Sequence, residues 1–317
     1  MSSLWKFAGL WLLLGLAGQS EPIRQEQQGA NMIEVNRADY AIPLISPPIV
    51  DTVKLNQLMD GLAKKVYRKP FNARVESGGN ILPERAGAQL NRKAFTEKFY
   101  GFFYGSTTSR LEVPVSPIYS KVDSELLVQI CERTIGYYVT YFNGGNESRY
   151  HNIKLAADAI NSYVLFPGET FSFNRVVGMR TVDKGYRRAP VIVKGEFSEG
   201  IGGGICQVSS TLFNAVDHAG LQIGARYSHS RRVPYVPPGR DATVSWGGPD
   251  FSFTNKYNQP IVIRTFVSRG KLTVTISSSD HIVYKQRNVP SASKVLPEEI
   301  NADLDANGDV IPAKPTS

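Results

Sequence analysis

The fold is decided by the stretch 202-GGGICQVSSTLFNA-215, in which three glycines lead into a segment with apolar residues at helical spacing. Glycine adopts backbone conformations that a Cβ atom forbids, so this turn can place Cys206 at the start of a helix. The unpaired amides and the dipole at that end of a helix favour a thiolate over a thiol. The stretch predicts a reactive cysteine, with a small buried cysteine at a close helix contact as the alternative.

Predicted β-strands lie on both sides of this helix, which we expect to end before Gly220. Alternating apolar residues and turn signals define the strands, and a second helix is expected at 150–163. The expected strands are 135–142, 171–174, 189–194, 222–227, 250–254, 260–267 and 271–277. The pattern predicts an α+β domain at 121–285, in which the glycine-flanked helix packs on a mainly antiparallel β-sheet.

A second, smaller α+β domain is expected at 50–120. Helical periodicity covers 53–67 and 91–104, and a hairpin is expected to turn at 78–80. This region resembles the peptidoglycan-binding domain that precedes several bacterial wall proteins. The resemblance rests on 72-NARV-75, the Gly78-Gly79 turn, Gly87 and Leu90. It implies a wall-binding module without catalytic residues.

The segments outside the two domains indicate where the protein works. Lys6 precedes an apolar run of about a dozen residues, 7–18, which is typical of a secretory signal and short for a membrane span. We expect a signal peptide or N-terminal anchor at 1–20, a linker at 21–49 and a disordered tail at 286–317. An extracytoplasmic protein is predicted, either secreted or membrane-anchored at the cell envelope.

The charge of the chain bears on its partners. The formal net charge of +8 and the pI near 9.3 favour acidic partners. No nucleic-acid-binding motif or long basic stripe is present, so nucleic acid is not an expected partner. We expect peptidoglycan or an anionic cell-wall polymer instead, with membrane contact only through an uncleaved N-terminal segment. No paired motif typical of zinc sites occurs, and neither a metal nor a cofactor is expected.

Three ordered motifs resemble those of the VanW family. They are 166-FPGETFSFN-174, 202-GGGICQVSSTL-212 and 235-YVPPGRDA-242, the last followed by Trp246. The resemblance covers about residues 124–264 of the chain. The family takes its name from a gene in a vancomycin-resistance cluster, and membership implies an extracytoplasmic bacterial protein associated with the cell wall. It implies no particular reaction.

A catalytic hypothesis comes from the order of three residues along the chain. Cys206, His229 and Asp241 follow the order found in papain-like and NlpC-type wall endopeptidases, with a cysteine nucleophile, a histidine base and an acidic residue that orients it. His218 lies more than three helical turns from Cys206 and cannot serve as the base. The hypothesis is a thiol-dependent peptidase or transpeptidase acting on peptidoglycan stem peptides.

Two alternatives stay open at this point. Cys206 and Cys131 are the two cysteines of the chain, and a disulfide between them would remove the thiol. The protein would then be a non-enzymatic binding or scaffold protein for cell-wall maintenance. Arginines such as Arg231 and Arg232 would contact carboxylates or phosphates, and aromatic rings would contact sugars or peptide. The predicted substrate-binding residues are Gly203, Gly204, Gln207, Ser209, Arg240 and Trp246.

Overall fold

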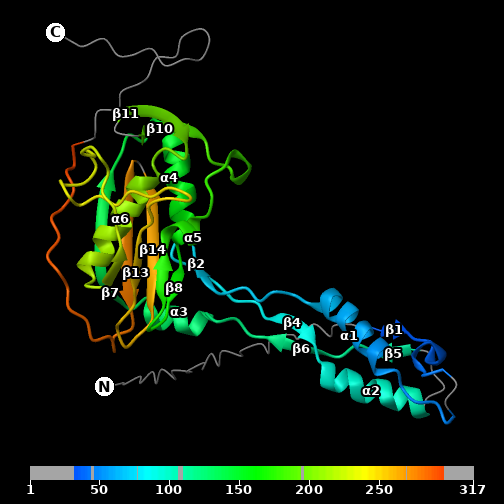
Figure 1. Cartoon of the computed structure of the whole chain (residues 1–317). Helices are drawn as coiled ribbons and strands as arrows, with labels where there is room; N and C mark the ends of the chain where they lie inside the picture. The colour runs from blue at the N-terminus through cyan, green and yellow to red at the C-terminus, as the bar shows by residue number, and fades with distance from the viewer. Residues whose placement is uncertain are drawn as a thin grey trace, which may run out of the picture. The chain divides into compact units, whose positions relative to one another are not determined.

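The computed structural model describes residues 32–43, 46–76, 78–105, 110–193, 196–268 and 270–295, with side chains omitted at 190–199. The chain forms two compact α+β units (Figure 1). The first contains residues up to Tyr67 together with Gln89–Ser116, and the second contains Arg68–Ala88 and the residues from Pro117 onward. The α+β fold class predicted from the sequence is confirmed.

The first unit is built around two helices that the periodicity predicted. Helix α1 (Thr52–Val66) starts at Asp51, whose Oδ1 accepts hydrogen bonds from the two backbone N–H groups of Val53 and Lys54. Such a cap satisfies donors that the first turn leaves free. Helix α2 (Arg92–Gly105) buries four phenylalanines and contributes most of the apolar core. They are Phe95, Phe99, Phe102 and Phe103.

The second half of the predicted linker at 21–49 is structured, which corrects that expectation. Strand β1 (Met32–Glu34) pairs antiparallel with β5 (Arg110–Glu112), and a short 3₁₀ helix, η1 (Arg37–Tyr40), follows it. Val35 is buried in the core of the first unit. The burial of Val35 and the pairing of β1 with β5 hold this segment in place. Its polar composition had suggested a linker.

The predicted domain at 50–120 is divided between the two units. Strands β2 (Arg74–Val75) and β3 (Ile81–Leu82) form the expected hairpin, but Ala73 and Val75 are buried with Leu127, Ile130 and Val262 of the second unit. Strands β4 (Gly87–Leu90) and β6 (Val115–Ile118) form a further two-stranded sheet. The hairpin therefore belongs to the larger core because its inward residues are buried there.

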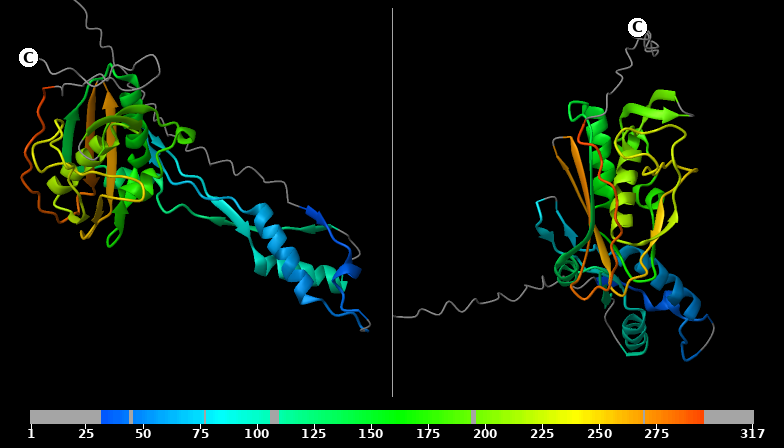
Figure 2. Two further views of the ribbon diagram at one scale, coloured as in Figure 1. Left: turned by 45° about the horizontal axis from the view of Figure 1, so that its top comes forward. Right: turned by 90° about the vertical axis from the view of Figure 1, so that its left-hand side faces the viewer.

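A four-stranded antiparallel sheet forms the centre of the second unit. Its order is β7 (Arg133–Tyr141), β15 (Lys271–Ser278), β14 (Ile261–Ser268) and β8 (Tyr163–Leu165). Helices α4 (Glu147–Ile160) and α6 (Ile205–His218) lie side by side on one face (Figure 2). Helix α3 (Ser124–Ile130) packs on the other face, where Val262 points. This is the predicted central helix on an antiparallel sheet.

Small residues let α6 approach the sheet closely. A Cβ atom at Gly136 of β7 would lie 2.5 Å from the carbonyl oxygen of Ala215, closer than real Cβ contacts allow. The face of α6 toward the sheet buries Val208, Leu212, Ala215 and other apolar residues completely. Position 136 therefore requires glycine, because a larger residue would push α6 and everything attached to it away from the sheet.

A second sheet and a hairpin complete the frame around α6. Strands β12 (Gln222–Ala225), β13 (Ser252–Thr254) and β9 (Thr170–Ser172) pair antiparallel in that order. The strand predicted at 171–174 ends at Ser172, and helix α5 (Phe173–Val177) starts directly after it. Helix η2 (Val182–Lys184) precedes the hairpin of β10 (Arg188–Val193) and β11 (Glu196–Ile201), which runs straight into the glycine turn.

Part of the predicted tail at 286–317 packs on the second unit, which corrects the expectation of disorder up to residue 295. The side-chain amide of Gln286 donates to the Ile135 carbonyl oxygen at 2.9 Å, and the Tyr138 hydroxyl donates to the carbonyl oxygen of Pro290 at 2.8 Å. Val289 packs against the apolar core. Hydrogen bonds to β7 thus order a segment that has no periodicity of its own.

The signal peptide or anchor predicted at 1–20 lies outside the described residues. Among the residues that the structure does describe, none of the helices combines the length and apolar character needed to cross a membrane.

Candidate functional site

The glycine turn determines where α6 begins. Gly202 and Gly204 have φ angles of +86° and +107°, which L side chains rarely adopt, and Gly204 is the N-cap of the helix. A Cβ atom at Gly204 would lie 2.8 Å from Cγ1 of Ile153. The buried side chain of Asn152 donates to the carbonyl oxygen of Gly203 at 3.1 Å and so pins the turn to α4. Cys206 is placed in the first turn of α6, as predicted.

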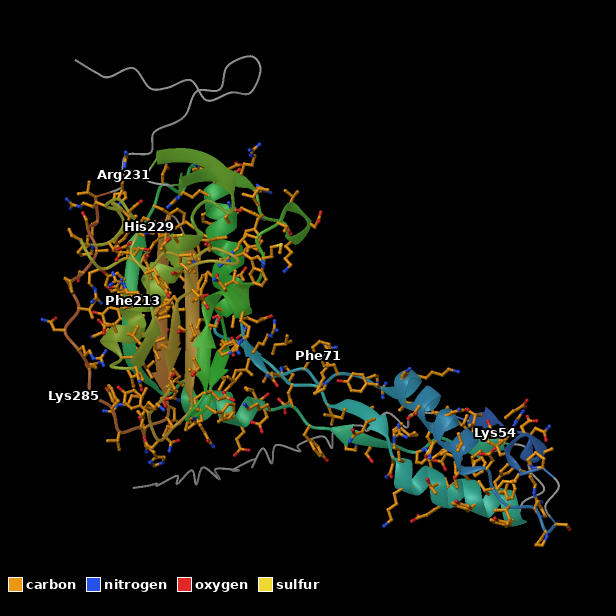
Figure 3. All side chains as sticks on the ribbon, viewed as in Figure 1. Lys54, Phe71, Phe213, His229, Arg231 and Lys285 are labelled. Carbon is orange, nitrogen blue, oxygen red and sulfur yellow. The ribbon has the colours of Figure 1, made fainter. Side chains whose placement is uncertain are left out.

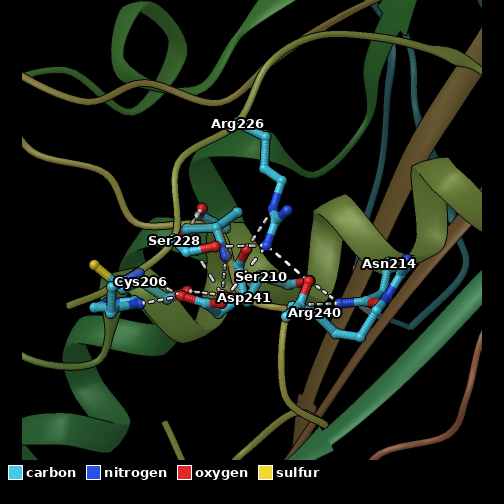
Figure 4. Close-up of polar contacts among 11 residues, drawn as sticks. Cys206, Ser210, Asn214, Arg226, Ser228, Arg240 and Asp241 are labelled. Atoms are coloured by element: carbon cyan, nitrogen blue, oxygen red, sulfur yellow. Dashed lines mark hydrogen bonds and ion pairs between the residues drawn. The ribbon is translucent and has the colours of Figure 1, made fainter. Parts of the chain in front are cut away.

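A buried polar stripe on α6 holds the segment that carries Asp241. The hydroxyl of Ser209 donates to the Ala242 carbonyl oxygen at 2.5 Å, and the Ser210 hydroxyl accepts from the Ala242 N–H at 2.9 Å. One turn farther along, the side chain of Asn214 donates to the Arg240 carbonyl oxygen at 2.7 Å (Figure 4). Residues 240–242 are therefore fixed along the helix by side chains spaced one turn apart.

The same segment brings Asp241 against His229. Nδ1 of His229 lies 2.7 Å from Oδ2 of Asp241, and the backbone N–H of His229 donates to the same oxygen at 2.6 Å. The two side chains are only 7% and 9% exposed. His229 lies toward the start of α6, with Phe213 farther along the helix (Figure 3). Because Nδ1 is bound by Asp241, the other ring nitrogen, Nε2, is the one that faces outward from this pair.

Cys206 completes the arrangement because its side chain lies close enough to that of His229 for each to shift the pKa of the other. The thiol is free and half-buried. Its Sγ atom also lies 3.6 Å from the Val244 carbonyl oxygen and 3.8 Å from Oγ1 of Thr243. The three residues singled out by chain order are thus joined in space in the order Cys206, His229, Asp241.

The electrostatics of the three residues favour charge separation. Burial alone raises the pKa of the Cys206 thiol, but the interaction with His229 and the contacts with Val244 and Thr243 together outweigh it and lower that pKa. Burial likewise lowers the pKa of His229, yet the bonds to Cys206 and Asp241 raise it above its ordinary value. Burial raises the pKa of the Asp241 carboxyl, and the two hydrogen bonds from His229 pull it below its usual range. The arrangement stabilises a thiolate beside an imidazolium.

An arginine that sequence reasoning missed supports the carboxylate. Nε of Arg226 donates to the Asp241 carbonyl oxygen at 2.7 Å, and its NH2 group donates to the Gly239 carbonyl oxygen at 2.7 Å and lies 3.6 Å from Oδ1 of Asp241. Its guanidinium lies 5.0 Å from the centre of the Phe213 ring. Arg226 lies within the strand predicted at 222–227 and no motif marks it, so its position in sequence gave no signal.

The predicted substrate-binding residues have different environments. Gln207 and Ser209 are fully buried, and both side chains bind backbone groups: Gln207 donates to the Tyr141 carbonyl oxygen at 3.0 Å, and Ser209 to that of Ala242. Gly203 is buried, and Gly204 caps α6. These four residues have structural roles, and their contact with substrate stays a prediction.

Arg240 and Trp246 also differ from each other. Nε of Arg240 donates to the side-chain oxygen of Asn214 at 2.7 Å, and its NH2 group lies 2.8 Å from Oδ2 of Asp217. Trp246 is 51% exposed. Of the predicted contact residues, Trp246 keeps a large accessible surface.

The alternative of a disulfide is not realised, because Cys131 and Cys206 are both free. Cys131 is the C-cap of α3, which packs on the face of the sheet opposite to α6. In the part of the chain that the structure describes, no three His, Cys, Asp or Glu side chains are grouped so as to hold a metal ion.

Comparison with known proteins identifies relatives along most of the chain. Residues 148–277 match the family model described as VanW like protein. The Bacillus subtilis protein named "Uncharacterized protein YoaR" is 57% identical over 295 residues, covering 93% of this chain and 97% of that protein. The "Vancomycin B-type resistance protein VanW" of Enterococcus faecalis is 36% identical over 114 residues, covering 34% of this chain and 42% of that protein. No solved structure matches the chain.

Proposed function

The chain belongs to the VanW family, and on that premise we propose that it is an exported cell-envelope protein that transfers acyl groups of peptidoglycan stem peptides through the thiolate of Cys206. Its relatives connect it with the cell wall or with vancomycin resistance. The reaction, the partner and the extracytoplasmic location are parts of the proposal. The +8 net charge is consistent with an anionic wall polymer as partner.

The observation that carries the proposal is the connected set of Cys206, His229 and Asp241. A nucleophile bonded to a base, with the base in turn oriented by a carboxylate, is the arrangement that nucleophilic catalysis requires. A purely structural cysteine needs neither a lowered pKa nor a charged histidine beside it.

The residues support a two-step acyl transfer. The Cys206 thiolate attacks the carbonyl carbon of an amide, so that a C–S bond forms and the carbonyl π electrons move onto oxygen. When the carbonyl re-forms, the C–N bond breaks and His229 gives its Nε2 proton to the leaving amine. A thioester on Cys206 remains, and His229 is now neutral. Asp241 keeps the imidazole oriented throughout and accepts no proton.

The second step decides between a peptidase and a transpeptidase. His229 takes a proton from water or from an acceptor amine as that nucleophile attacks the thioester carbonyl, and the thiolate leaves with the electrons of the C–S bond. The backbone N–H of Cys206, in the first turn of α6, is our candidate donor to the oxygen that becomes negative. Water gives hydrolysis, whereas an amine from a second stem peptide gives a cross-link.

A binding or scaffold function without catalysis is the second candidate. The half-exposed indole of Trp246 and the exposed side chains of Arg231 and Arg232 favour it, because such groups contact sugars, peptides and anions. In this case, the ion pair at Cys206 would have no chemical role. The resemblance of the N-terminal region to wall-binding modules is compatible with both candidates.

The test is incubation of the full chain with purified peptidoglycan and with stem peptides, followed by mass spectrometry of the products and of the protein. We expect cleaved or cross-linked peptides and an acyl group on Cys206, both lost in Cys206→Ala by a factor on the order of 10⁴ or more. Cys131→Ser is the matched control and should leave the products unchanged. Peptidoglycan that binds the wild-type protein but emerges with unaltered peptides would favour the scaffold function and contradict the catalytic one.

A further inference from the structure

The guanidinium of Arg180 is incompletely hydrogen-bonded. Both of its terminal nitrogens, NH1 and NH2, are buried and make no hydrogen bond with the residues that the structure describes. The guanidinium lies 5.7 Å from the centre of the Phe173 ring. An arginine stays charged at any physiological pH, and a buried charge without a partner is costly. A ligand that supplies the missing acceptors would remove this cost.

Arg180 packs against the turn that starts α6. Its Cβ lies 3.3 Å from the position that a Cβ at Gly202 would occupy, so glycine at position 202 makes room for it. The side chain is within electrostatic range of Cys206, Tyr186 and Asp250. The unpartnered guanidinium is thus part of the surroundings of the thiol.

The two anionic groups near Arg180 are those of Asp250 and Cys206. The first accepts hydrogen bonds from other residues, and the second is too small to pair with both guanidinium nitrogens. Oδ2 of Asp250 accepts from the Ser172 hydroxyl at 2.6 Å, and Oδ1 accepts from the backbone N–H groups of Asn174 and Phe251 at 2.9 and 2.8 Å. The thiolate of Cys206 is a single atom and interacts with His229. Neither can fill two parallel N–H groups at once. Two free nitrogens of one guanidinium match the two oxygens of a carboxylate.

We propose that Arg180 binds a carboxylate of the peptide whose carbonyl group Cys206 attacks. The proposal rests on the thiolate chemistry proposed above and narrows its substrate. A carboxylate held this near the nucleophile belongs to a residue close to the bond that is broken. The preferred substrate is then a peptide with a free carboxylate beside that bond, at its C-terminus or on the adjacent side chain, rather than the middle of an uncharged chain. Arg180 acts as a substrate-positioning and specificity-determining residue.

Alkylation of the full chain tests the charge preference without any enzymatic assay. Iodoacetate and iodoacetamide react with a thiolate in the same way, but only iodoacetate carries a carboxylate. We expect the ratio of their rates at Cys206 to fall about tenfold in Arg180→Gln, because a charge-assisted contact is lost. Arg180→Lys, which keeps the charge but not the planar fork, should give an intermediate ratio. Peptide mapping reads Cys131 in the same sample as an internal control.

Arg175→Gln is the matched control for net charge. Arg175 lies on α5 and is exposed, with its NH2 group donating to the Thr170 carbonyl oxygen, so the same charge change there should leave the ratio within twofold. Equal losses of both rates in Arg180→Gln would show that Arg180 only supports the thiolate, and would overturn carboxylate recognition. An unchanged ratio in a folded Arg180→Gln would overturn it as well.

A binding measurement separates this proposal from the proposed reaction. In the Cys206→Ser background no thiol chemistry occurs, and calorimetry can compare N-acetyl-D-alanyl-D-alanine with its C-terminal amide. We expect the acid to bind about tenfold more tightly than the amide, and this preference to disappear on adding Arg180→Gln. An unreactive Cys206 with the preference intact would refute the thiolate chemistry alone. Equal binding of acid and amide would refute the role of Arg180 alone.

Discussion

The two ends of α6 differ in how the charged side chains around them are paired. At the C-terminal end, Asp217 is 15% exposed and binds two arginines, each at 2.8 Å. At the N-terminal end, Cys206 and His229 stabilise each other's charged forms, and the terminal nitrogens of Arg180 have no hydrogen-bond partner within the described part of the chain. At the C-terminal end, arginines are thus paired with a carboxylate, whereas at the N-terminal end the Arg180 guanidinium lacks hydrogen-bond partners among the described residues. The two ends of α6 therefore differ in whether their charged groups have partners within the protein, and not in which residue types they contain. The N-terminal end is the one suited to chemistry.

Replacing His229 should give the largest effect at the open end. In His229→Gln the thiolate loses its hydrogen bond and its opposite charge, so the pKa of Cys206 moves up toward its ordinary value. Thiol-dependent turnover should fall by a factor on the order of 10² to 10⁴ because the acid and base are also lost. The rate of iodoacetamide alkylation against pH checks the electrostatic part.

The sign of the pH effect follows from the two directions of shift. A thiol whose pKa is lowered stays a thiolate as the pH decreases, until the pH passes below that value. Alkylation of Cys206 should therefore persist to lower pH in the wild type than in His229→Gln. His218→Gln is the same substitution at the other end of α6, where Nδ1 accepts from the backbone N–H of Tyr137 at 3.2 Å. If the pH profile of His218→Gln matched that of His229→Gln, the proposed difference between the two ends of α6 would be wrong.

Replacing Asp217 should change stability and leave the chemistry intact. Burial raises the pKa of this carboxyl, but Arg287 and Arg240 outweigh it and lower the pKa, so its stabilising effect is present above the ordinary carboxyl pKa and is lost as pH falls through the lowered value. Asp217→Asn leaves the half-buried Arg240 without a counter-charge and should lower the free energy of unfolding at pH 7 by about 2 kcal/mol.

Chemical denaturation measures this change, and Asp158→Asn provides the control. Asp158 pairs with Lys154 one turn away on the exposed side of α4, where such pairs contribute about 0.5 kcal/mol or less. Alkylation of Cys206 should stay within twofold of the wild type in Asp217→Asn. A large loss of thiol reactivity would show that the two ends of α6 are coupled, and the comparison would fail.

Different kinds of sequence information predict the fold and the grouping of Cys206, His229 and Asp241. Periodicity was enough for α1, α2 and the β14–β15 hairpin, because one face of each is buried and the pattern repeats. The hypothesis that Cys206 and His229 lie close together came from chain order, since one helix and one strand can return the chain to its starting end. No periodic signal marks residues 286–295, whose order depends on hydrogen bonds to β7.

The polar residues on α6 show why a single sequence cannot assign ligand contacts. Gln207 and Ser209 beside a candidate nucleophile look the same in sequence whether they face a ligand or the interior. In the structure, they bind backbone groups of other segments, which a single sequence cannot reveal. Arg180 and Arg226 were missed for the same reason. Their roles depend on which partners the fold provides, and those partners are distant in sequence.

The smallest expected effect concerns Trp246, two residues beyond Val244, whose carbonyl lies beside Cys206. Because the indole is 51% exposed, Trp246→Ala should alter the free energy of unfolding by only about 0.5 kcal/mol. If peptidoglycan docks at the open end of α6, loss of a flat aromatic surface there should weaken its binding by a factor of about ten.

Co-sedimentation with purified cell walls measures that loss, and Phe266→Ala is its matched control. Phe266 is also 51% exposed, but on β14 it shares a face with Val262, on the side of the sheet opposite to α6. The two substitutions each remove an aromatic ring of equal fractional exposure, one near the thiol and one on the opposite side of the sheet. Loss of wall binding in Phe266→Ala with none in Trp246→Ala would move the ligand surface away from the thiol. Loss confined to Trp246→Ala would place the wall polymer at the end of α6 where charge is left unmatched.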